Sequence, residues 1–194
     1  MKTIKTIACF GGSQGNSGDP GYDAMQEVGR LLVEYGCMVA TGGYGGTGME
    51  APARGANEAG GEAIGYTILG RKGNPFLTGA VDCRCLCNNT VDPSREIQYG
   101  VRLGKLLAAD GFIVAATGGP GTMVEMMAVI NLNCKLWQSS PKHLAILNIG
   151  SGQGAGWDAN MLNRLSVWGV LPFEARAMIL VAETPEEAVR WVMT

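Results

Sequence analysis

The feature of this sequence that most constrains its fold is a regular alternation of short apolar runs with amphipathic segments. Buried strands are predicted for seven of these runs, namely Lys5–Phe10, Met38–Thr41, Ala63–Ile68, Asp82–Leu86, Gly111–Ala116, His143–Ile149 and Met178–Ala182. Strands that alternate with helices pair in parallel, and helices then cover both faces of the sheet. The alternation therefore predicts a Rossmann-like, doubly wound α/β fold.

Helices are predicted between these strands, where apolar side chains recur every three or four residues. They cover Pro20–Tyr35, Met49–Ala59, Pro93–Ala108, a methionine-rich segment that ends near Leu132, Asp158–Trp168 and a final segment that begins at Pro185. The last of these helices has a local start signal, because Thr184 and Glu187 have the spacing of a capping box. The segment 69–80 is predicted to be an irregular loop. With 194 residues, the chain fits a single domain over 1–194, since domains typically span ~100–200 residues.

Glycine is the most informative residue type in the composition. The 30 glycines gather at the ends of the apolar runs, where glycine permits tight turns and close approach of the backbone to a ligand. Ligands of parallel sheets bind beyond the carboxyl ends of the strands. The glycine clusters therefore predict a small-molecule site that is built largely from main chain.

Charge and hydropathy exclude two classes of partner. Fifteen basic and seventeen acidic side chains give a net charge of −2, and the basic residues are scattered rather than gathered in the stripe that nucleic-acid binding needs. No stretch approaches the ~18 consecutive apolar residues of a membrane span. The run Ile7–Phe10 is too short for the core of a signal peptide. We therefore expect a cytoplasmic protein that binds neither nucleic acid nor membranes.

The six cysteines are expected to be thiols, because disulfides are rare in the cytosol. Cys83, Cys85 and Cys87 alternate within a predicted strand and would share one face of it. Structural zinc sites usually have four ligands and a Cys-x2–4-Cys spacing. We therefore expect no metal at this C-x-C-x-C run.

Two glycine motifs suggest functions that their context disfavours. Gly11–Gly15 matches the G-x-S-x-G of a serine hydrolase, but turn-forming residues follow it where a helix is needed, and His143 is the only histidine available as a base. Gly43–Gly48 matches the dinucleotide pattern G-x-G-x-x-G, which needs an acid at the end of the next strand. Glu62 lies at the start of that strand instead.

A third motif joins the most apolar strand to a helix. It runs Gly118-Gly119-Pro120-Gly121-Thr122, and Glu125 lies one turn inside the helix. The free N–H groups and the dipole of a helix N-terminus bind anions, so this junction is a candidate phosphate site. The alternative interpretation is a tight turn followed by an acid that the helix dipole favours.

Four segments carry a resemblance to a known family. They are ACFGGSQGNSGDPGYDAMQEVGRLLVEYG, TGGYGGTGMEAPARGANEAGG, RLGKLLAADGFIVAATGGPGTMVEMM and LNIGSGQGAGWDANMLNRLSVWGVL. Together they resemble the Lonely Guy family of cytokinin-activating nucleoside 5′-monophosphate phosphoribohydrolases, which are often labelled lysine decarboxylases. The third segment resembles the family signature P-G-G-x-G-T-x-x-E, although Thr117 replaces its proline. The second glycine loop is one residue longer than in the family. The decarboxylase label does not fit, because no lysine lies in a glycine-rich strand-end loop.

The resemblance implies cleavage of the N-glycosidic bond of a purine nucleoside 5′-monophosphate, with adenine or an N6-substituted adenine as the base. The products would be the free base and ribose 5-phosphate, and no cofactor or metal would be needed. Glu125 and Arg102 would be the catalytic residues, with Arg95 as the alternative arginine. The implied substrate-binding residues are Gly12, Ser13, Gly43, Gly45, Arg95, Gly118, Gly119, Gly121 and Thr122.

A binding protein is the competing hypothesis. A similar fold and glycine signature are found in carriers of molybdenum cofactor, a phosphorylated pterin. Such a carrier would need the phosphate loop but no catalytic role for Glu125.

Assembly into a homodimer is also expected, because two predicted helices have apolar residues on more than one face. These residues are Ile97, Val101, Leu103, Leu106 and Leu107 in one helix, and Met123, Met126, Met127, Val129 and Ile130 in the other. One face of each helix would cover the sheet. The other face would pair with a second copy of the chain.

Overall fold

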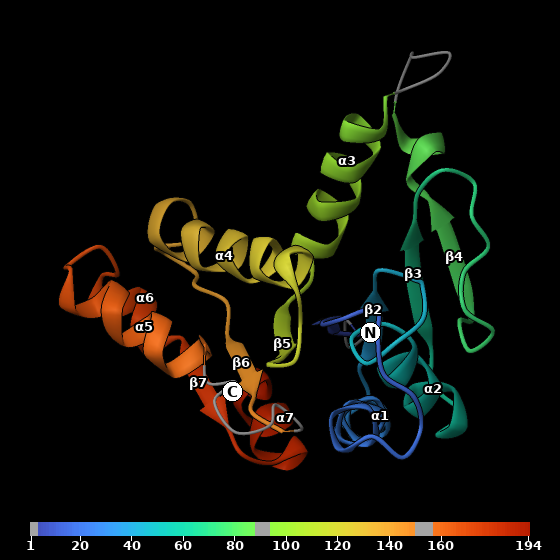
Figure 1. Ribbon diagram of the computed structural model, residues 1–194, viewed down its shortest axis with the longest axis horizontal. Coiled ribbons are helices and arrows are strands. Elements are labelled where there is room, and N and C mark those ends of the chain that lie inside the picture. Colours follow the sequence, from blue (N-terminus) through green and yellow to red (C-terminus); the bar gives the residue numbers. More distant parts are fainter. Residues whose placement is uncertain (1–3, 88–93, 150–156) are drawn as a thin grey trace.

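A computed structural model of the protein describes residues 4–87, 94–149 and 157–194 (Figure 1). Its seven strands form one parallel sheet in the order β4-β3-β2-β1-β5-β6-β7. They are β1 (Thr6–Phe10), β2 (Met38–Thr41), β3 (Ala63–Thr67), β4 (Gly79–Asp82), β5 (Gly111–Ala115), β6 (Leu144–Leu147) and β7 (Ile179–Ala182). The predicted doubly wound parallel fold is confirmed.

Helices cover both faces of the sheet, as the alternation of elements requires. They are α1 (Pro20–Glu34), α2 (Glu50–Glu58), α3 (Arg95–Leu107), α4 (Pro120–Lys135), α5 (Trp157–Val167), α6 (Phe173–Ala177) and α7 (Pro185–Met193). The core on one face is formed with α1, α2 and α7. The core on the other face is formed with α4, α5, α6 and the C-terminal part of α3. The short helix α6 was not predicted from the sequence.

The strand order places β1 between β2 and β5 at the centre of the sheet. Ile7 is in register with Val39 of β2 on one side and with Gly111 of β5 on the other. The chain therefore leaves β1 in one direction through β2 and later continues in the other direction through β5. Such a reversal opens a crevice at the carboxyl ends of the central strands. The glycine loops that follow β1, β2 and β5 all meet at this edge.

The predicted strand Asp82–Leu86 was wrong. The strand lies earlier, at Gly79–Asp82, where it pairs with β3, so the predicted loop 69–80 was also too long. Cys83–Leu86 forms a 3₁₀-helix, because the Asp82 side chain accepts a hydrogen bond from Arg84 N at 3.0 Å and so ends the strand. The three cysteines consequently do not share one face.

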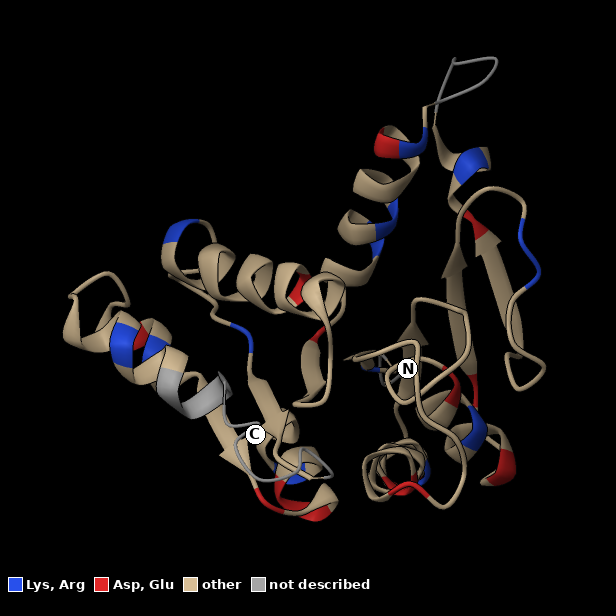
Figure 2. Cartoon of the chain, viewed as in Figure 1, with Lys and Arg blue, Asp and Glu red and all other residues tan. Residues whose placement is uncertain are grey.

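The structure bears on three further features that the sequence suggested: metal ligands, membrane-spanning helices and the distribution of basic residues. Among the described residues, no cluster of three or more His, Cys, Asp or Glu is arranged to hold a metal ion. Within the same ranges, no helix has the length and apolar character needed to cross a membrane. Lys and Arg residues are dispersed over several elements rather than aligned along one of them (Figure 2).

Candidate active site

A cavity of about 260 Å³ opens at the crevice beside the carboxyl end of β1. Its walls come from the end of β1 and the first glycine loop (9–13), from Gly42 and Met49, from α3, and from the first turns of α4. The cavity brings together seven of the predicted site residues: Gly12, Ser13, Arg102, Gly119, Gly121, Thr122 and Glu125. Elements far apart in the sequence therefore meet where the strand order predicts a ligand site.

The N-terminus of α4 lines one part of this cavity. Gly119 is the N-cap residue, and it offers no side chain to satisfy the amides of the first turn. Pro120 has no N–H, so the amides of Gly121 and Thr122 are the first donors that the helix presents. First-turn amides lack partners within their own helix, and the dipole adds partial positive charge. This geometry suits a phosphate or another oxyanion.

The role of Gly118 in this loop is to make room for a side chain. A Cβ atom at Gly118 would overlap the side chain of Thr122, which is buried in the first turn of α4. Gly118 itself does not line the cavity. It therefore acts by letting the loop close over Thr122.

Glu125 lines the cavity from the next turn of α4 and is only 8% exposed. Burial removes water from its carboxylate and raises the pKa of Glu125 to about 7, and the positive charge of Arg102 offsets part of that rise. A carboxyl group with a pKa near neutrality is suited to acid–base chemistry, because it can hold or release a proton at physiological pH.

Arg102 reaches the cavity from α3 and is largely committed to backbone carbonyls. Its Nε donates to Tyr66 O at 2.8 Å, and its Nη2 donates to Gly42 O at 3.0 Å. Its Nη1 lies 3.9 Å from Glu125 Oε1. The guanidinium thus ties together the ends of β3 and β2, and it turns its remaining nitrogen toward the buried carboxylate.

The other predicted residues lie outside this cavity. Arg95 is the exposed first residue of α3, so of the two candidate arginines only Arg102 lines the cavity. Gly43 and Gly45 belong to the second glycine loop and do not line it either. Gly43 instead has φ +82° and accepts a hydrogen bond from Asn74 N at 2.8 Å.

The glycines of the second glycine loop allow its backbone to pack directly against the backbone of the first glycine loop. A Cβ atom at Gly48 would overlap the backbone of Gly11, and Gly48 N donates to Gly12 O at 3.1 Å. Thr47 N donates to Gln14 O at 2.9 Å. Glycines in this loop therefore allow it to support the first glycine loop, which forms the wall of the cavity.

Seven residues that line the cavity were not among the predicted site residues: Cys9, Phe10, Gly11, Gly42, Met49, Tyr99 and Pro120. Cys9–Gly11 and Pro120 directly adjoin predicted residues that line the cavity, whereas the other three do not. Tyr99 lies three residues before Arg102, so helical periodicity alone could have placed it on the same face of α3. Gly42 and Met49 carried no such signal. Gly42 is needed because an added Cβ would overlap Arg102 Nη2, and that contact depends on the tertiary packing that brings Arg102 of α3 to the end of β2.

The geometry also argues against the serine hydrolase hypothesis. Ser13 follows the carboxyl end of β1, whereas His143 precedes β6 at the opposite edge of the sheet. The His143 ring packs edge-on against Trp191 at 4.9 Å between centroids. The only histidine of the chain is therefore not placed to activate Ser13.

Comparison with known proteins identifies the fold rather than a sequence family. No family model matches the chain, and no curated protein does. Solved structures do match over nearly the whole chain. TM1055, a structural-genomics target, has a TM-score of 0.67 and 25% identity, with 98% of this chain and 99% of that chain covered.

Two further matches are proteins that bind molybdenum cofactor. The molybdenum cofactor binding protein of Rippkaea orientalis has a TM-score of 0.65 and 19% identity over 100% of both chains. The molybdenum cofactor carrier protein of Chlamydomonas reinhardtii has a TM-score of 0.63 and 17% identity, covering 98% of this chain and 97% of that one. The chain therefore has the same Rossmann-like α/β fold as these proteins.

Proposed function

We propose that this protein is a nucleoside 5′-monophosphate phosphoribohydrolase of the Lonely Guy type. Its substrate would be a purine nucleotide with adenine or an N6-substituted adenine. The observation that carries the proposal is the buried Glu125 beside Arg102, in a cavity that the N-terminus of α4 also lines. An anion site and an ionisable carboxyl group in one cavity match a substrate that has a phosphate next to the bond that breaks.

The phosphate would lie against the amides of Gly121 and Thr122. Glu125, one turn further along α4, would then face the ribose. Glycosidic cleavage passes through an oxocarbenium-like transition state, which a nearby carboxylate stabilises. Binding the distant phosphate aligns the sugar with that carboxylate, so binding energy is used at the reacting carbon.

In the proposed reaction the oxygen of a water molecule bonds to C1′ of the ribose. The bond between C1′ and the base nitrogen breaks, its electron pair stays on the base, and the base takes up a proton from solvent. Glu125 accepts the proton of the attacking water, which it can do when it is ionised, and releases that proton to solvent afterwards. Arg102 Nη1 holds the ionised form of Glu125 by its charge and can also bind a ribose or phosphate oxygen. None of these steps requires a metal or a redox cofactor.

We further propose that two copies of the chain pair through α3 and α4. Four apolar side chains are exposed on these helices near the cavity: Ile97, Tyr99, Met123 and Val124, of which Ile97 and Val124 are each 48% exposed. Apolar surface of this kind is typical of a contact between protein chains. We also propose a cytoplasmic location, in keeping with six cysteines of which none is in a disulfide.

The test is incubation with a panel of nucleoside monophosphates, followed by assays for ribose 5-phosphate and free base. We expect release of both products in equal amounts from at least one purine nucleotide, and none from the matching nucleoside that lacks the phosphate. No release from any member of the panel would remove the hydrolase proposal.

A carrier of a phosphorylated pterin is the second candidate, favoured by the similarity of fold to two proteins that bind molybdenum cofactor. A carrier would use the N-terminus of α4 in the same way. Tight binding of the pterin without turnover of nucleotides would support it, and turnover with no pterin binding would exclude it.

A further inference from the structure

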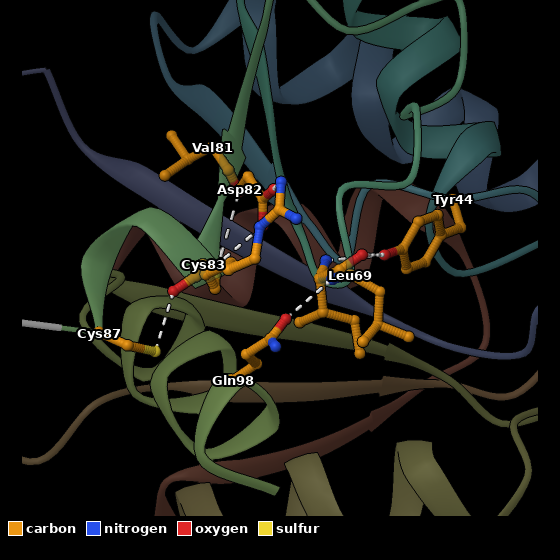
Figure 3. Close-up of polar contacts among 9 residues, drawn as sticks. Tyr44, Leu69, Val81, Asp82, Cys83, Cys87 and Gln98 are labelled. Atoms are coloured by element: carbon orange, nitrogen blue, oxygen red, sulfur yellow. Dashed lines mark hydrogen bonds and ion pairs between the residues drawn. The ribbon is translucent and has the colours of Figure 1, made fainter. Parts of the chain in front are cut away.

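Side chains from α3 and from the second glycine loop hold the segment Tyr66–Leu69. This segment comprises the last two residues of β3 and the two residues that follow, and we call it the β3 exit segment. Arg102 of α3 contacts it at Tyr66 O through Nε at 2.8 Å. Gln98 of α3 contacts it at the other end, where Gln98 Oε1 accepts from Leu69 N at 2.9 Å (Figure 3).

These two contacts come from the same face of α3. Gln98 and Arg102 are four residues apart, so they lie one above the other on the helix. Both are buried, at 3% and 8% exposure. Figure 1 shows α3 extending away from the sheet toward the end of β3. The β3 exit segment is therefore a principal anchor for the part of α3 that carries Arg102.

The second glycine loop grips the same segment through one side chain. The Tyr44 hydroxyl accepts from Ile68 N at 2.7 Å and donates to Ile68 O at 3.0 Å. The Tyr44 ring also lies beneath the Arg102 guanidinium, with Cζ 5.8 Å from the ring centroid. Tyr44 therefore contacts both the guanidinium and the backbone to which that guanidinium is bonded.

We propose that Tyr44 and Gln98 are positioning residues for Arg102, and that by holding the β3 exit segment they set the guanidinium at its distance from Glu125. Neither residue lines the cavity, so neither touches the ligand. The proposal rests on the proposed function only in taking Glu125 as the reacting carboxyl group.

The physical reason is that the attraction between the Arg102 guanidinium and the Glu125 carboxylate depends strongly on the distance between them. Nη1 is 3.9 Å from Glu125 Oε1, and the attraction between two buried charges falls as they separate or as water enters. The Arg102 charge lowers the pKa of Glu125 against the effect of burial. A displaced guanidinium would therefore let that pKa rise further.

The experiment measures the titration of Glu125 itself, without substrate, by carbon-13 NMR of side-chain carboxyl groups. The Glu125 signal is assigned by its loss in Glu125→Gln. We expect Tyr44→Phe and Gln98→Met each to raise the pKa of Glu125 by about half a unit or more, in the direction of the larger rise in Arg102→Met. In the Arg102→Met background, Tyr44→Phe should add nothing, since coupled residues are not additive.

The matched control is Tyr22→Phe. Tyr22 is a buried residue whose hydroxyl donates to Glu50 Oε1 at 2.9 Å, but this bond joins α1 to α2. Tyr22→Phe should therefore leave the pKa of Glu125 unchanged. If Tyr44→Phe and Gln98→Met behave as Tyr22→Phe does, the proposal is wrong. It is also wrong if Arg102→Met leaves the pKa unchanged.

Two variants, Tyr44→Phe and Gln98→Met, are used so that the test still works if one of them fails to fold. Tyr44→Phe removes a single oxygen, and Gln98→Met keeps the length of the side chain. Because the titration needs no turnover, it stays informative if the nucleotide panel yields no products. A hydrolase with an unshifted Glu125 titration in both variants would refute the positioning role alone.

Discussion

Arg102 and Glu125 meet across two helices, α3 and α4, with 3.9 Å between Nη1 and Oε1. Both residues are 8% exposed, and both line the cavity at the carboxyl edge of the sheet. Burial raises the pKa of the Glu125 carboxyl group to about 7, while the guanidinium favours its ionised form. The carboxyl group is thereby held near the balance between its two protonation states, which is the property that an acid–base catalyst needs.

The first prediction separates catalysis from binding. Glu125→Gln preserves size and polarity but removes the charge that would steady an oxocarbenium ion. Turnover of the preferred nucleotide should fall by at least ~100-fold, while nucleotide affinity measured by calorimetry should change little, because the α4 amides bind the phosphate. Near-full activity in a variant with a native circular dichroism spectrum would exclude the proposed role of Glu125.

The second prediction concerns stability and pH. The pKa of Glu125 is about 7 in the folded protein against its ordinary value of 4.5, so the folded state retains a proton that the unfolded state releases. The free energy of unfolding should therefore fall as the pH rises from about 4.5 to about 7. At about 1.4 kcal/mol per pKa unit, the loss is at most about 3.5 kcal/mol.

Urea denaturation at pH 5 and pH 8 measures this loss. Glu125→Gln should be less sensitive to pH than the unaltered protein by that amount. The exposed residue Glu174 supplies the control, since Glu174→Gln should keep the full pH dependence. Equal pH dependence in both variants would contradict the assignment.

The third prediction distinguishes the two arginines on α3. Arg102→Ala should reduce both kcat and nucleotide affinity, and it should also destabilise the fold, because Tyr66 O and Gly42 O lose a donor and Glu125 loses its charge partner. Arg95→Ala removes an exposed side chain of the same type, so activity and stability should stay close to those of the unaltered protein. The reverse outcome would place Arg95 in the site.

The fourth prediction compares two glycines. Gly42→Ala should displace Arg102, since the added methyl group would overlap Nη2, and both activity and melting temperature should fall. Gly104→Ala lies on α3, where a Cβ meets nothing within 4 Å. Alanine favours helix there, so the variant should gain about 0.5–1 kcal/mol of stability. Calorimetric melting of the two variants in parallel is the measurement.

The fifth prediction concerns assembly. Light scattering at micromolar concentration should give the mass of a dimer, and Val124→Glu on α4 should dissociate it by placing a charge in an apolar contact. Val170→Glu, at the similarly exposed Val170 between α5 and α6, should leave the dimer intact. A monomeric mass for the unaltered protein would refute the proposed pairing.

Local patterns in the sequence determined the class of fold and the start of the phosphate loop. Alternation of apolar runs and helical segments is a short-range signal, and it was sufficient to predict a parallel sheet, to place six of its seven strands, and to place a helix directly after the glycine motif 118–122. The cap of α7 is equally local. Thr184 Oγ1 accepts from Glu187 N at 3.2 Å, as the spacing of the two residues predicted.

Pairing between strands decided what local patterns could not. The strand β4 ends at Asp82, which is the last residue that pairs with β3. The Asp82 side chain then caps the 3₁₀-helix that follows. The site depends on the same long-range order. Gly42 follows β2, Tyr66 lies in β3 and Arg102 lies in α3, and they meet only because β2 and β3 are neighbours in the sheet and α3 packs at their carboxyl ends. The sequence by itself determined the alternation of strands and helices and the positions of the glycines, whereas only the tertiary structure decided that Arg102 faces Glu125, because that contact depends on how α3 packs against elements far from it in the chain.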